Sequence, residues 1–74
     1  MKKATMTANE LKFYEAGIKD ANETRSIVFA YQSKRATELF KALKLGISTE
    51  CVKCLDAYNS GVAHEINRQT RLEF

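Results

Sequence analysis

Apolar residues recur at helical spacing along most of the chain. With each residue placed at 100° per step, the apolar side chains between residues 11 and 43 fall on one side of a helical wheel. They are Leu11, Tyr14, Ile18, Ala21, Val28, Phe29, Ala36, Leu39, Phe40 and Leu43. Because the phase is kept throughout, the pattern predicts one long helix, or two helices joined almost in line.

Capping signals mark the ends of this predicted helix. Thr7 and Glu10 have the spacing of a capping box, in which the Thr hydroxyl and the Glu carboxylate accept hydrogen bonds from free amides of the first turn. Gly46 can take the left-handed conformation that commonly ends a helix. Lys44 lies in the last turn, where a cation stabilises the helix dipole. We therefore predict helix over residues 7–45.

One segment within this range leaves a break open. Asp20 and Glu23 could cap a second helix, although residues 20–24 contain neither Pro nor Gly. The prediction for residues 7–45 is therefore one helix, or two helices that meet near 20–24.

Another long helix is predicted after the turn. Ser48 or Thr49 can cap it, and a single apolar face then runs in phase. That face consists of Cys51, Val52, Leu55, Tyr58, Val62 and Ile66. The pattern predicts helix over residues 48–70. Ala57 and Gly61 lie one turn apart and form a strip of small side chains that another backbone could approach closely.

Together these elements predict an all-α fold in a single helical domain, residues 1–74, with a disordered N-terminus over residues 1–6. The long N-terminal helix, broken near 20–24 or continuous, turns at Gly46 into the second long helix. The two arms then form an antiparallel helical hairpin or a small bundle.

An antiparallel hairpin closed at Gly46 leaves the tip of the first arm uncovered. Pairing outward from the turn exhausts the second helix, so residues 11–21 overhang by roughly 15 Å. The overhang exposes three apolar side chains: Leu11, Tyr14 and Ile18. Their exposure forfeits about 1.5–3 kcal/mol for each side chain. Either the chain bends near 20–24 and folds back as a third helix, or a second copy or a foreign helix covers this tip.

A second apolar group lies on the opposite side of the long helix. It consists of Phe13, Ile27, Tyr31 and Leu45. A helix with two apolar sides is either central in a bundle or contacts a partner on its second side. We therefore assign partner binding to six residues of the two groups: Leu11, Tyr14, Ile18, Phe13, Ile27 and Tyr31.

The turn region also resembles a DNA-binding motif. Between Glu38 and Ala57, the residue types follow the helix-turn-helix pattern at six positions. The matching residues are Ala42, Leu45, Gly46, Ile47, Val52 and Leu55. The resemblance implies a recognition helix whose side chains enter the major groove. Those side chains are Ser48, Thr49, Glu50 and Lys53. Lys41 and Leu43 depart from the pattern, because such motifs usually bury the first position and expose the second.

The composition describes a folded chain with a mild basic bias. Of the 74 residues, 45% are hydrophobic and 28% are charged, and the formal net charge is +3. Residues 1–37 carry seven Lys or Arg against four acids, and residues 38–74 carry five against five. Nucleic acid is therefore an allowed partner, but a less favoured one than protein. The longest apolar runs are far too short to span a membrane, so we expect no membrane partner.

Candidate chemistry is sparse. Cys51 and Cys54 have the spacing of half a zinc site, but only His64 could join them, so we expect two semi-buried thiols and no metal. The sequence shows no nucleophile–base pair and no glycine-rich phosphate loop, which predicts a protein that is not an enzyme and takes no cofactor or small-molecule substrate. Two cysteines and the lack of a secretory signal favour the reducing cytoplasm.

The predicted function is protein binding without catalysis. A small helical chain of this build is typical of inhibitors, adaptors and chaperone-like subunits that act by helix packing. We expect the partner to be another protein or a second copy of the chain, so that the protein is oligomeric. The alternative is a small helix-turn-helix transcriptional regulator with its motif at residues 38–57.

Overall fold

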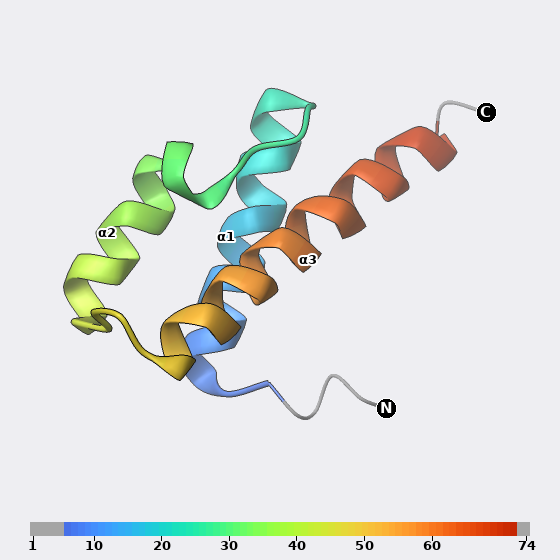
Figure 1. Ribbon diagram of the computed structural model, residues 1–74. Coiled ribbons are helices and arrows are strands. Elements are labelled where there is room, and N and C mark those ends of the chain that lie inside the picture. The colour runs from blue at the N-terminus through green and yellow to red at the C-terminus, as the bar shows by residue number, and fades with distance from the viewer. Residues whose placement is uncertain (1–5, 73–74) are drawn as a thin grey trace.

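The computed structural model describes residues 6–72, which form three α-helices and one short 3-10 helix (Figure 1). The elements are α1 (Ala8–Thr24), η2 (Ala30–Gln32), α2 (Lys34–Leu43) and α3 (Thr49–Leu72). No strand occurs among these described residues, and the all-α fold is confirmed. The predicted disorder over residues 1–6 lies, apart from Met6, outside the described residues.

Of the two possibilities left open for residues 7–45, the structure has two separate helices, because α1 ends at Thr24 and α2 begins only at Lys34. The cap of the second helix is Ser33, so the expectation that Asp20 and Glu23 cap it is wrong. The Thr24 hydroxyl donates to the carbonyl of Asp20 and accepts from the amide of Ser26. These bonds from a side chain compete with the hydrogen bonds that would continue the helix. Arg25 then takes a left-handed conformation with φ of 57°, which turns the chain back without a Pro or Gly.

The turn between α2 and α3 contains two left-handed residues. α2 ends at Leu43 and is followed by Lys44 with φ of 53°, while Gly46 has φ of 59°. The residue that ends the helix is therefore Lys44, two positions before the predicted glycine. Ser48 accepts a hydrogen bond of 3.2 Å from the amide of Cys51, which caps α3 with one of the two residues that the sequence offers.

α1 and α3 run parallel to each other. Asn9 near the start of α1 donates a 2.9 Å hydrogen bond to Glu50 near the start of α3. Asn22 near the end of α1 donates a 2.9 Å hydrogen bond to Glu65, far along α3. The partners of successive α1 residues thus lie successively further along α3, as expected for parallel helices. Residues 25–48 connect the end of α1 to the start of α3 and include η2 and α2 (Figure 1).

Of the two predicted arrangements, the structure is the small bundle and not the antiparallel hairpin. In the hairpin, the second helix would pack mainly on residues 28–43, whereas the closest packing in the structure joins α1 to α3. The reason is the break after Thr24, which lets the first arm fold back as a helix of its own. The overhanging tip is therefore covered within the chain itself.

The crossing of α1 and α3 depends on two glycines. A Cβ atom added to Gly17 would lie less than 3.0 Å from the backbone of Tyr58, and one added to Gly61 less than 3.0 Å from the backbone of Tyr14. Real Cβ atoms do not make such contacts, so the two backbones touch where neither helix has a side chain. This confirms the close approach expected at the small-residue strip of Ala57 and Gly61, and the approaching backbone is that of α1.

α1 is the central helix, with α3 on one side and α2 on the other (Figure 1). The molecule is flat, with principal extents of 41 × 30 × 14 Å. The ring of Phe13 packs against Phe40 of α2 at a centroid distance of 4.7 Å. The two apolar sides predicted for this helix thus both contact other helices, as expected for a helix at the centre of a bundle.

The assignment of Phe13 to a partner-binding surface is therefore wrong. Its side chain is fully buried, because α2 folds back over the side of α1 that a continuous helix would have left open. Leu11 from the opposite group is nearly half exposed instead. The buried hydrophobic core consists of Phe13, Ala16, Ala21, Ala30, Ala36, Cys54, Ala57, Tyr58 and Val62.

We predict that Gly61→Ala destabilises the protein. Alanine favours helix by about 1 kcal/mol over glycine, but its methyl group would force the backbones of α1 and α3 apart. We expect the free energy of unfolding to fall by about 1–3 kcal/mol, the usual cost of overpacking a core. Urea denaturation followed by circular dichroism measures this. The neighbouring exposed Ser60→Ala is the matched control and should change stability by less than about 0.5 kcal/mol; a Gly61→Ala variant as stable as this control would contradict the prediction.

Candidate protein-binding groove

A carboxylate at the centre of the bundle joins all three α-helices. Asp20 of α1 accepts hydrogen bonds of 2.5 Å from the hydroxyls of Ser33 and Tyr58, and it pairs with the guanidinium of Arg35. Ser33 caps α2 and Tyr58 belongs to α3, so one side chain fixes α1 relative to both. Burial, and next the hydrogen bond to Asp20, raise the pKa of Tyr58 to about 12. These groups are occupied in holding the fold together.

A second carboxylate ties the far end of α3 to α1. Glu65 is buried and accepts hydrogen bonds from Arg68, Asn22 and Gln69. The donated bonds, that of Arg68 first, lower the pKa of Glu65 to about 2. Gln69 also donates to the carbonyl of Ala21 at 3.3 Å. The buried charge is thus matched by donors from both helices, which is the condition for burying a carboxylate without a large penalty.

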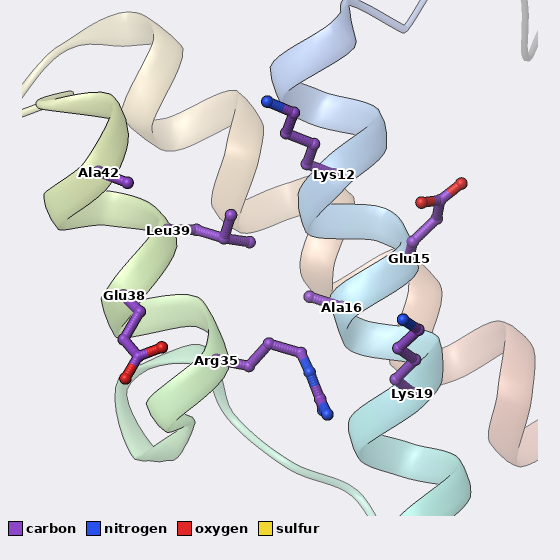
Figure 2. Close-up of a pocket in the computed structure, with 8 residues that line it drawn as sticks. All are labelled: Lys12, Glu15, Ala16, Lys19, Arg35, Glu38, Leu39 and Ala42. Atoms are coloured by element: carbon purple, nitrogen blue, oxygen red, sulfur yellow. The ribbon is translucent and has the colours of Figure 1, made fainter.

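A groove of about 430 Å³ runs between α1 and α2 (Figure 2). It is lined by Lys12, Glu15, Ala16, Lys19, Arg35, Glu38, Leu39 and Ala42. Leu39 points from α2 towards α1, while Glu15 extends away from α2 (Figure 2). The guanidinium of Arg35 is already engaged by Asp20 and Glu23. Because cations and acids alternate along it, this groove favours no single class of ligand.

A different groove, between α3 and the segment that follows α1, is apolar. We call it the linker–α3 groove; its volume is about 310 Å³. One wall comes from the segment between α1 and η2, and the floor comes from α3. The lining residues are Ile27, Val28, Phe29, Asn59, Val62, Ala63, Ile66 and Asn67. None of them is charged, although 28% of the residues in the chain are.

Large apolar side chains stand exposed along the wall of this groove. Ile27 is 66% exposed and Phe29 is 51% exposed. The ring of Phe29 stacks on that of Tyr31, with centroids 5.8 Å apart and planes inclined by only 10°, and Tyr31 is itself 81% exposed. Such a cluster costs free energy in water, and exposed apolar patches commonly mark sites of protein association.

The structure separates the residues that the sequence assigned to partner binding. Ile27 lines the linker–α3 groove, and Tyr31 lies on η2, where its ring stacks on that of Phe29. Leu11, Tyr14 and Ile18 remain on α1, where Tyr14 and Ile18 are half-buried against the backbone of α3. The tip of α1 is therefore mainly part of the intramolecular packing, and the exposed apolar surface lies at the linker.

Sequence reasoning missed most of the groove. The wheel placed Phe29 on the core side, because it assumed helix through residues 25–33. Asn59, Ala63 and Asn67 carry no signal in the periodicity of apolar residues. A usable signal was present nonetheless: residues 26–33 and 57–64 are the two longest stretches without Asp, Glu, Lys or Arg.

The helix-turn-helix resemblance is not reflected in the packing. Such a motif buries apolar residues in the turn and in the second helix, yet Ile47 is fully exposed and Val52 is 57% exposed. The predicted reading residues Thr49 and Lys53 are exposed, but Ser48 serves as a helix cap and Glu50 accepts a hydrogen bond from Asn9. Two of the buried apolar residues that would hold a recognition helix in place are therefore missing.

The two cysteines lie on α3 as free thiols. Cys51 is half-buried and Cys54 is buried, and burial raises the pKa of the Cys54 thiol. Within residues 6–72, metal-ligating side chains do not gather in a group of three or more. In the same range, no helix combines the length and the apolar character needed to cross a membrane.

Comparison with known proteins gives no relative. The chain matches no protein-family model, and no curated protein or solved structure is significantly similar to it.

We predict that Tyr58→Phe weakens the fold and changes its response to alkali. The variant leaves one lone pair of the partly buried Asp20 without its donor, which should lower the free energy of unfolding by about 1–2 kcal/mol. Because the folded pKa of Tyr58 is raised from 10.0 to about 12, its contribution is complete below pH 10 and is lost as the pH rises to 12. Urea denaturation between pH 7 and 12 measures both effects. A Tyr58→Phe variant that loses stability with pH as steeply as the parent would contradict the assignment.

We predict that Glu65→Gln removes part of the acid sensitivity of the protein. Because the folded pKa of Glu65 is lowered from 4.5 to about 2, the carboxylate stabilises the fold above pH 4.5, and this contribution fades as the pH falls to 2. The variant should have a lower Tm at pH 7 and a shallower loss of Tm below pH 4.5. Thermal denaturation from pH 7 to pH 2 measures both, with the exposed Glu15→Gln as control. Parallel curves for the parent and Glu65→Gln would show that Glu65 has no such role.

Proposed function

We propose that this protein is a non-catalytic binding module that accepts an apolar segment of another polypeptide chain in the linker–α3 groove. The observation that carries the proposal is the uncharged lining of that groove, bordered by the exposed Ile27 and Phe29. Inhibitors, adaptors and chaperone-like subunits of this size act in the same manner, by packing against a partner.

The chemistry of the groove supports a protein segment as the occupant. A charged group enclosed against Val62, Ala63 and Ile66 would be desolvated without a counter-ion. A hydrocarbon side chain in the same place gains about 25 cal/mol for each Å² removed from water. The amides of Asn59 and Asn67 supply hydrogen bonds at the rim, which orient a peptide rather than a lipid chain.

The proposal includes no catalytic step. The two carboxylates at the helix contacts are engaged in the fold, Asp20 by three donors and Glu65 by three more. The two free thiols, Cys51 and Cys54, support a reducing cytoplasm as the place of action.

Photo-crosslinking in cells that express the full chain tests this function. Ile27 is replaced by the photoreactive benzoyl-phenylalanine, which keeps an apolar side chain at the groove wall. We expect irradiation to give a covalent adduct heavier than the chain. Val52, which is also apolar, exposed and far along the sequence, takes the same photoreactive group as the matched control and should give little adduct.

A second variant ties the adduct to the groove. Adding Ala63→Glu to the photoreactive chain places a charge on the groove floor, and it should remove the adduct while the helix content stays unchanged. If positions 27 and 52 give equal adducts, or neither gives one, the groove is not a protein-binding site.

A further inference from the structure

A second groove begins where the wall of the linker–α3 groove ends. The wall segment runs from the end of α1 across to η2 and the start of α2 (Figure 1). There η2 and one side of α2 form a groove of about 300 Å³. We call it the η2–α2 groove; its lining includes Tyr31, Lys34, Thr37, Glu38 and Lys41. In contrast to the linker–α3 groove, it is bordered by charged side chains.

A pair of aromatic rings joins the two grooves. Phe29 lines the linker–α3 groove and Tyr31 lines the η2–α2 groove. The two rings stack with their centroids 5.8 Å apart, and both are exposed. Apolar surface therefore continues from one groove to the other, and a single segment of a partner chain can occupy both.

The η2–α2 groove carries cations that the fold does not use. Lys34 and Lys41 are both exposed, and within residues 6–72 neither forms an ion pair. They lie two helical turns apart and therefore on the same side of α2. One acid among the described residues, Glu38, also lines this groove. The lining thus keeps an excess of positive charge, within a segment, residues 34–44, that has four Lys or Arg against one acid.

An apolar groove that continues into a basic one defines the chemistry of the bound segment. Apolar side chains fit the linker–α3 groove, where a charge would be desolvated without a counter-ion. Carboxylates fit beside Lys34 and Lys41, because these cations are open to water and pairing with them requires little desolvation. The two lysines lie about 10 Å apart along α2, a distance that an extended chain covers in about three residues.

We propose that the partner segment combines an apolar stretch with acidic residues on one side of it. The apolar stretch binds in the linker–α3 groove, and two carboxylates about three positions apart pair with Lys34 and Lys41. This inference rests on the linker–α3 groove being a protein-binding site, as proposed above. It adds the charge pattern of the bound segment and the second half of the surface that binds it.

Exposed aromatic rings beside lysines are also typical of proteins that bind single-stranded nucleic acid. The linker–α3 groove argues against that ligand, because a nucleic acid carries a phosphate at every nucleotide and the groove has no charged lining residue. Lys34 and Lys41, with Glu38 beside them, would also neutralise few phosphates. An acidic peptide needs carboxylates only where the two lysines lie.

Selection of peptides on the purified full chain provides a probe for this surface. A displayed library of random peptides is used, and we expect the enriched sequences to combine apolar residues with Asp or Glu. Ala63→Glu should abolish their binding, since it places a charge on the floor of the linker–α3 groove. Enriched peptides that depend on Ala63 but lack acids overturn the inference and leave the proposed function intact. If no peptide is enriched, or none depends on Ala63, both proposals fail.

Fluorescence polarisation with one labelled, enriched peptide measures the role of the two lysines. Replacing both, Lys34→Gln and Lys41→Gln, should raise the Kd about threefold to tenfold, as expected for the loss of two exposed ion pairs. The matched control is Lys12→Gln with Lys19→Gln. These two lysines are also exposed and two turns apart on one helix, but they line neither groove. The control lowers the net charge equally and should change the Kd less than about twofold.

A neutral form of the same peptide, with each Asp or Glu replaced by its amide, completes the test. It should bind the parent chain and the Lys34→Gln, Lys41→Gln variant equally, and only the acidic peptide should lose affinity as salt is raised. Circular dichroism checks that every variant keeps its helix content, which glutamine supports as well as lysine does.

Two results of these measurements overturn the inference. If both pairs of lysine replacements weaken binding equally, the net charge of the chain attracts the acids and the η2–α2 groove does not. If labelled oligothymidine binds the parent chain, displaces the peptide and requires Lys34 and Lys41, these lysines serve single-stranded nucleic acid instead.

Discussion

The contact between the backbones of α1 and α3 at Gly17 and Gly61 determines the rest of the structure. With no side chain between them, the two helices come close enough for Asp20 to reach Tyr58 and for Glu65 to reach Asn22. The buried Glu65 and the partly buried Asp20 then obtain donors from neighbouring elements. A wider crossing would leave these charges desolvated without partners, which costs far more than the glycines lose in helix propensity.

The same crossing explains how a thin molecule holds a core. At 14 Å in its smallest extent, the bundle has little depth in which to bury large side chains. The core accordingly consists mostly of alanines, with Phe13 and Tyr58 as its two large members. Small residues allow close packing of helices, but they leave apolar area uncovered at the edges. Ile27 and Phe29 of the linker and Tyr31 of η2 are part of that uncovered area.

The helices could be predicted from the sequence, but the way in which they pack could not. Apolar periodicity and the capping residues Thr7 and Ser48 located the starts of α1 and α3 correctly, because these signals are local, whereas the start of α2 after Ser33 was not predicted. The predicted helix ends were less accurate, because the left-handed residues that end α1 and α2 are Arg25 and Lys44 and not glycines. A wheel drawn through the break at Thr24 then placed Phe29 with the core.

A helical wheel could not predict the groove, for a related reason. Its wall is an irregular segment, and its floor is the face of α3 that the crossing with α1 leaves free. Both depend on a tertiary contact between residues more than forty positions apart, such as Asn22 and Glu65. The two long stretches without charged residues are a local signal that points to this surface, and apolar periodicity does not detect them.

The parallel course of α1 and α3 has a consequence for the speed of folding. In a helical hairpin the first contacts form between residues close in sequence. Here Asn9 contacts Glu50 and Ala21 contacts Gln69, at sequence separations of 41 and 48 residues. The chain entropy lost in closing such long loops opposes folding before the packing of the helices stabilises it. The packing of α1 on α3 therefore forms late, and during synthesis it is completed only once residue 69 has left the ribosome.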